Sequence, residues 1–317
     1  MLYYKGQHTI ASRAAQERFE ALSLNNPIFG ARLMLEREEL IEQAYLYKML
    51  SERLPQGIPL QEVLEQVREE SLATTKLPLA IDYMLSELRH YGVMAPAMAN
   101  LSHYFTPFQT YLIEAAEQEG GRFDIRTAVE VMRCEVEYRT AEPSLAGLFL
   151  FQFESLCRNR LSYDQGLKAI SQDAVFDPSW QDWILIVRRQ IGIVDFADMV
   201  YVRSQHYYHR RFGEDSLEEP EQPILFATKE GKIAWANRKK DPLFLFAALQ
   251  RQLGYPEVPR PKPFDDTPQI TARLVRRMEQ LEGRIQLLEE EQRGGIDLSN
   301  FFSGEMPFSG SSEPPPS

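Results

Sequence analysis

The sequence predicts an all-α protein made of antiparallel multi-helix bundles, with a small β-hairpin near residues 224–236 and a C-terminal heptad helix. Two observations predict this class. Apolar residues recur every three or four positions along most of the chain, which is the period of an amphipathic helix. Short breaks that contain Gly, Pro or Asn separate these runs, so successive helices can fold back on one another.

The same pattern divides the chain into seven segments. In order, they are an N-terminal helical extension (1–37), a first helical bundle (38–142), a second helical bundle (143–215), a hairpin plus helix (222–254), a proline-rich linker (255–269), a heptad helix (270–293) and a disordered tail (294–317). Hydrophobic residues make up 44% of the chain and charged residues 26%, which is the composition of a folded chain.

The first bundle is expected to contain six helices with short connections. Apolar stripes predict two or three helices over residues 10–54, the last of which enters this bundle, and one helix each over residues 60–67, 77–91, 96–101 and 108–119 and from residue 125 onward. Pro55-Gln56-Gly57 closes the first helix and Gly92 closes the third, as helix-breaking residues do. Asp124 is expected to be the N-cap of the last helix, with its carboxylate accepting an amide proton from the first turn.

In the second bundle, Pro178 and Trp180 open a helix that Gly192 interrupts, and a further helix is expected from Val194 to Phe212. After it, ILFATKEGKIAWA (224–236) alternates between apolar and polar residues around Lys229-Glu230-Gly231-Lys232, which predicts the hairpin. An apolar helix is expected over residues 242–253.

The C-terminal part begins with the linker, which is expected to be stiff because it contains five prolines. Beyond it, apolar residues follow a heptad spacing, and the predicted interaction positions are Leu274, Met278, Leu281, Ile285 and Leu288. This helix either self-associates or packs on its own protein. The tail is rich in Gly, Ser and Pro, a composition typical of disorder.

Charge and cysteine content narrow the functional classes. The net charge of −11 argues against general nucleic-acid binding, which requires a basic face. A local cluster, Lys229, Lys232, Arg238, Lys239 and Lys240, is interpreted as a solvated turn. The two cysteines, Cys134 and Cys157, lie in apolar helical patterns and indicate a reducing compartment rather than a disulfide framework. The longest apolar runs are far shorter than the roughly 20 residues of a membrane span, so none is predicted.

Catalytic motifs are scarce. Glu87 and His90 form one Glu-x-x-His, a spacing that places two metal ligands on one helix face. A di-iron bundle needs that motif twice, and the second copy is missing. The sequence has no phosphate-binding glycine loop and no Gly-x-Ser-x-Gly motif. The protein is therefore predicted not to be an enzyme.

The helix boundaries of the first bundle follow a definite order. A Gly-x-Pro-Leu turn (57–60) joins two helices, and Phe-Thr-Pro (105–107) leads into a helix in which Ala116-Glu117 precedes Gly120. Phe123-Asp124 then opens the last helix. This order resembles the cytoplasmic helical domain of the inner-membrane platform proteins of type II secretion and type IV pilus systems. That family has Gly-Glu in place of Ala116-Glu117 and Leu-Asp in place of Phe123-Asp124, and one residue is inserted here in the turn.

The family usually carries this domain twice. The second bundle resembles a degenerate copy over residues 147–213, in which Phe176-Asp177-Pro178 mirrors the helix entry and Ile193-Val194-Asp195 mirrors the restart. Two features depart from the family: the middle helix pair is missing, and Arg188 stands where the family has a glutamate.

The resemblance implies a non-enzymatic scaffold or adaptor that has lost the membrane spans of the family and acts through contacts of its helical bundle. It implies a secretion or pilus motor ATPase, or a platform protein, as partner. It also implies homo-oligomerisation and a place in the cytoplasm or at the periphery of the inner membrane. A calcium site at Glu117 is implied as well, the alternative being a plain surface carboxylate. Two other functions stay open: a self-assembling structural subunit, and a helical-bundle metalloenzyme that uses Glu87 and His90.

Overall fold

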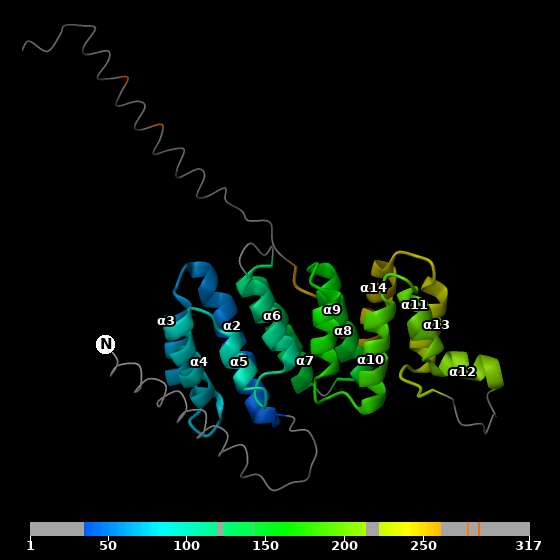
Figure 1. Cartoon of the computed structure of the whole chain (residues 1–317), viewed down its shortest axis with the longest axis horizontal. Coiled ribbons are helices and arrows are strands. Elements are labelled where there is room, and N and C mark those ends of the chain that lie inside the picture. The colour runs from blue at the N-terminus through cyan, green and yellow to red at the C-terminus, as the bar shows by residue number, and fades with distance from the viewer. Residues whose placement is uncertain are drawn as a thin grey trace, which may run out of the picture. The chain divides into compact units, whose positions relative to one another are not determined.

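The computed structural model describes residues 35–118, 123–141, 143–213 and 222–260, together with Met278 and Ile285. Within these residues the chain forms thirteen α-helices and no strand, which confirms the predicted all-α class. Figure 1 shows the helices of residues 35–260 side by side, with α2–α5 at one end of the row and α11–α14 at the other. None of the described helices is long and apolar enough to cross a bilayer.

The six helices expected in the first bundle all form, in the predicted order. They are α2 (Arg37–Arg53), α3 (Leu60–Glu70), α4 (Leu77–Tyr91), α5 (Ala95–Asn100), α6 (Pro107–Glu117) and α7 (Ile125–Thr140). Helix α2 packs along α7, and α3 packs against α4. The buried stripes of these helices, such as Val63, Leu64 and Val67 on α3, meet in a shared core.

Local chemistry explains most of these boundaries. Gly57 adopts a φ of +80°, a left-handed conformation that glycine adopts without steric cost, and so ends the first helical segment. Thr106 begins α6 with a capping box, in which its hydroxyl accepts from the Gln109 amide at 3.2 Å and the Gln109 side chain accepts in return. Asp124 holds the N-cap position of α7 as predicted, but its carboxylate accepts no capping hydrogen bond; it lies 3.9 Å from Arg126 instead.

The second part of the chain adds five helices. They are α8 (Leu145–Arg158), α9 (Tyr163–Ser171), α10 (Pro178–Gln190), α11 (Phe196–Val202) and α12 (Gln205–Phe212). Asp177 caps α10 by accepting from the Trp180 amide at 3.0 Å. The single helix expected from Val194 to Phe212 is wrong, because Ser204 breaks it. The Ser204 side chain accepts from Tyr207 N as a new N-cap, and Ser204 pairs with Phe226 in an isolated bridge.

The hairpin predicted near residues 224–236 is also wrong. Residues 228–237 form helix α13 (Thr228–Asn237), and Gly231 lies inside it instead of in a turn. A Cβ on Gly231 would lie 2.2 Å from the Ser204 hydroxyl oxygen. This glycine therefore permits close packing of α13 against the start of α12, a tertiary requirement that local alternation cannot reveal.

Helix α14 (Pro242–Leu253) forms as predicted and packs against α8 and α13. The next residues do not behave as a linker. Tyr255 and Val258 are buried, the Tyr255 hydroxyl donates to Glu154 at 2.8 Å, and the Asn159 amide donates to the Pro259 carbonyl at 3.2 Å. The packed part thus continues to Arg260, and residues 261–269 lie outside the described residues.

A continuous hydrophobic core runs through the described helices of residues 35–260. Buried charges join the two predicted bundles, because Arg139 on α7 pairs with Glu135 at 2.9 Å and also with Asp173, which follows α9. Helix α7 also packs against α8. These contacts link the two predicted bundles. Whether they are separate domains that divide at residue 142 stays a prediction.

The remaining predicted segments fall largely outside the described residues. Residues 1–34 of the N-terminal extension and residues 294–317 of the tail lie there entirely. Of the five heptad positions, only Met278 and Ile285 are described; both are helical and exposed, at 60% and 53%. Leu274, Leu281 and Leu288 lie outside, and the role of the heptad helix stays a prediction.

Candidate functional site

Glu117, the residue to which the resemblance assigns calcium, has a structural role in this fold. Its two carboxylate oxygens accept from the backbone amides of Met94 at 2.5 Å and Ala95 at 3.0 Å. These amides open helix α5 and have no partner within that helix, so Glu117 satisfies them and ties α6 to α5. The calcium site stays a prediction that this arrangement does not favour.

Glu87 and His90 lie on α4, where Glu87 is partly buried and His90 is exposed. Across the described residues, no group of three or more His, Cys, Asp and Glu side chains is placed to hold a metal ion. Within the part of the chain that the structure describes, no further ligands thus join this pair as a bundle metal centre would require.

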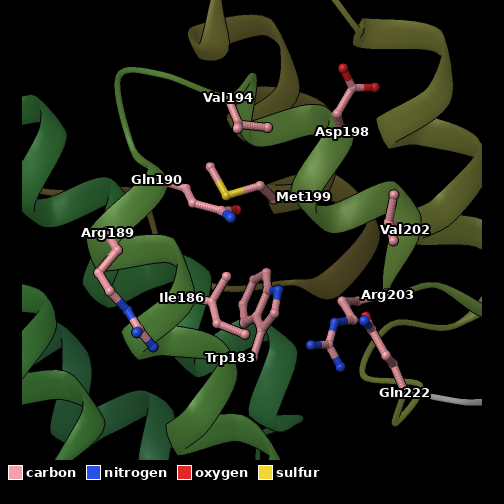
Figure 2. Close-up of a pocket in the computed structure, with 10 residues that line it drawn as sticks. All are labelled: Trp183, Ile186, Arg189, Gln190, Val194, Asp198, Met199, Val202, Arg203 and Gln222. Atoms are coloured by element: carbon pink, nitrogen blue, oxygen red, sulfur yellow. The ribbon is translucent and has the colours of Figure 1, made fainter.

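A groove of about 470 Å³ opens between the end of α10 and helix α11 (Figure 2). Its apolar walls are formed by Trp183, Ile186, Val194, Met199 and Val202. Trp183 is almost fully buried and packs edge-on against Phe149 of α8 and Phe226, so the aromatic core fixes its position. The groove therefore has a rigid apolar floor that is open to solvent above.

The rim of this groove exposes large aliphatic side chains. Two of the lining residues, Val194 and Val202, are 38% and 45% exposed. Ile193, which precedes Val194 in the chain, is 85% exposed, and Gly192 with φ +86° turns the chain just before it. Clustered exposed apolar residues beside a hollow are typical of protein–protein contact sites, whereas isolated ones are common on any surface.

Two arginines flank the apolar floor. Figure 2 shows the Arg203 guanidinium directed toward Trp183, Arg189 on the opposite side, and Asp198 at the far end pointing away. Arg189 donates to the Leu185 carbonyl at 3.1 Å and Arg203 to the Pro223 carbonyl at 3.4 Å, and among the described residues no carboxylate pairs with either. Partial burial lowers the pKa of Arg203 from its ordinary value. Asp198 lies 3.5 Å from Arg238.

A basic surface lies near the groove on α12 and α13. Two guanidiniums lie over the ring of Trp235, those of Arg210 at 4.2 Å and Arg238 at 3.3 Å from the ring centre. Burial, followed by the charges of Lys232, Arg210 and His209, lowers the pKa of His206. The predicted solvated turn of Lys229, Lys232, Arg238, Lys239 and Lys240 is thus in part helix α13, with Arg238 held by stacking.

A second hollow, of about 960 Å³, lies beside α5, α6 and the start of α9. Glu117 lines it, and so do Arg158, Arg160 and Arg260. Arg158 is paired with Glu154, and Glu117 is used at the start of α5. Two of its charged side chains are therefore already used within the fold.

The sequence did not predict the groove. The sequence pattern places its residues in helix stripes and in a degenerate copy of the first bundle. One signal was present: Gly192 is followed by Ile193 and Val194, two β-branched apolar residues in a connection where polar residues are usual. The predicted sites, Glu117, Glu87 with His90, and the heptad positions, are not part of the groove.

No family model matches the chain, and no curated protein or solved structure matches it.

Proposed function

We propose that this protein is a non-enzymatic adaptor that binds a protein partner in the groove between α10 and α11. The observation that carries the proposal is the exposed aliphatic rim of Val194 and Val202, which line the hollow together with the buried Trp183. A partner that covers this rim removes apolar surface from water, which is the main favourable term in protein association.

The resemblance of residues 38–142 to secretion and pilus platform proteins names the first partners to test, a motor ATPase or a platform protein of such a system. The helix boundaries at Gly57 and Thr106 are consistent with the resemblance. In this proposal the first bundle supports the fold, and the second bundle presents the binding groove.

The test is direct binding of the purified full chain to purified motor ATPases and platform proteins, measured by biolayer interferometry. Val202→Glu, at a groove residue that is 45% exposed, should weaken binding about 10- to 100-fold, because burying one large aliphatic side chain contributes about 1.5–3 kcal/mol. Ile41→Glu is the matched control, since Ile41 is 50% exposed on α2, far along the row from the groove (Figure 1). Equal affinities for the two variants would refute the groove as the binding site, and no binding to any of these proteins would remove the secretion and pilus partners.

A further inference from the structure

The charged residues around the groove indicate which kind of ligand fits it. Its floor is apolar, and Arg189 and Arg203 flank that floor on two sides. An arginine guanidinium presents a planar fork of donors that matches a carboxylate in a bidentate contact. Each of the two uses one donor group on a backbone carbonyl, which leaves further N–H groups for a ligand.

We infer that the groove binds an extended peptide segment that carries a bulky apolar side chain next to one or two carboxylates. The apolar side chain lies on Trp183 and Ile186, and the carboxylates bind Arg189 and Arg203. This inference deepens the proposed adaptor function and depends on it.

Three features favour a peptide over a small anion or a nucleic acid. The exposed Val194 and Val202 line the groove beside the floor, and covering both of them requires a chain instead of a compact ligand. Phosphate groups gain nothing from such a rim, because they bind through charge. Among the described residues that line the groove, Asp198 is the one carboxylate; it points away from the floor and lies beside Arg238, and so does not neutralise the two arginines.

Selection from a random dodecapeptide phage library on the immobilised full chain tests the inference without assuming a sequence. The wild-type protein should enrich peptides that place Asp or Glu within a few positions of Leu, Ile, Phe, Met or Trp. The double variant Arg189→Glu/Arg203→Glu should enrich peptides in which Lys or Arg takes the place of the acidic residues. Arg189→Glu alone, at an exposed position, covers the case in which a glutamate at the half-buried Arg203 prevents folding.

Arg37→Glu is the control for a general change of charge. Arg37 is exposed in the first turn of α2, where an acidic residue is favourable to the helix dipole, so this variant should enrich the same acidic peptides as the wild type. For one selected peptide, replacing its carboxylates by amides should weaken binding about tenfold or more to the wild type, since hydrogen bonds to charged groups are the strong ones. The same replacement should have little effect on binding to Arg189→Glu/Arg203→Glu.

Each other outcome overturns the inference. These outcomes are enriched peptides without acidic residues, the same acidic peptides on the charge-reversed variants, an equal change with Arg37→Glu, or no enrichment at all. The proposed function fails separately, when Val202→Glu and Ile41→Glu bind a protein partner equally well. If Val202→Glu loses the partner while the selected peptides show no charge preference, the adaptor function stands and the acidic peptide does not.

Discussion

Replacing Arg139 by leucine should destabilise the protein more than any exposed ion-pair substitution. Arg139 lies at the junction of α7 with the turn after α9, its side chain is 10% exposed, and it pairs with Glu135 and Asp173, which are 0% and 4% exposed. Burial alone would lower the pKa of Arg139, but Asp173 and Glu135 raise it above its ordinary value, so the guanidinium stays charged. The substitution leaves two buried carboxylates without their cation.

The expected cost follows from that loss. Removing one partner of a buried ion pair typically costs about 3–5 kcal/mol, because the remaining charge is desolvated and uncompensated. For a folded unit of this size, each kcal/mol lowers Tm by about 2–4 °C, so Arg139→Leu should lower Tm by about 6–20 °C. Urea unfolding followed by circular dichroism at 222 nm measures the free energy, and a thermal scan measures Tm.

Arg133→Leu is the matched control on the same helix. Arg133 pairs with Glu130 at 2.6 Å and Glu137 at 2.7 Å, but these carboxylates are 36% and 48% exposed, so solvent screens both pairs. Exposed pairs contribute about 0–1 kcal/mol, and the control should lose no more than that. Equal losses for Arg139→Leu and Arg133→Leu would refute the idea that the buried charges join α7 to the second part of the chain.

Two further predictions concern packing and the thiols. Gly231→Ala should lower the free energy of unfolding, measured with urea, by about 1–3 kcal/mol, because the new Cβ would lie 2.2 Å from the Ser204 hydroxyl oxygen. A loss below about 0.5 kcal/mol would contradict that close approach. Burial raises the pKa of Cys134 to about 11 and that of Cys157 to about 12, so the native chain at pH 8 should react slowly with Ellman's reagent and the unfolded chain rapidly. The native thiols keep their protons in a pH range where the thiols of the unfolded chain, above about pH 8.5, release them. The stability that the buried thiols contribute should therefore be present below that pH and be lost toward pH 11–12. Rapid labelling of the native thiols at pH 8 would contradict both statements.

The sequence was sufficient for most helix boundaries because short-range chemistry decides them. Gly57 takes a left-handed φ, Thr106 forms a capping box with Gln109, and Pro178 follows an N-capping aspartate. Each of these effects depends on residues within four positions, so pattern and spacing predict it.

The errors have a tertiary origin. Gly231 appeared to be a turn glycine, but it is small because α13 lies against Ser204. The stretch after Leu253 contains enough proline to be a linker, yet Tyr255 is buried and bonded to Glu154, which lies 101 positions earlier in the chain. Contacts between residues so far apart leave no mark in the local periodicity.

The groove was hidden for the same reason. Trp183 and Met199 have the helical spacing of core residues, and both are indeed buried. That they also form the floor and wall of an open hollow depends on how the end of α10 meets α11 (Figure 2). Glu117 shows the converse case, since a residue that resembles a ligand by its place in a motif binds backbone amides of α5 instead.

Hydrogen–deuterium exchange of the full chain, alone and with a bound motor ATPase or platform protein, tests the adaptor groove most directly. The partner should slow exchange in peptides that cover residues 183–203 and leave exchange in the peptides of α3 and α4 unchanged. Slowed exchange confined to α2–α5, with residues 183–203 unaffected, would contradict it.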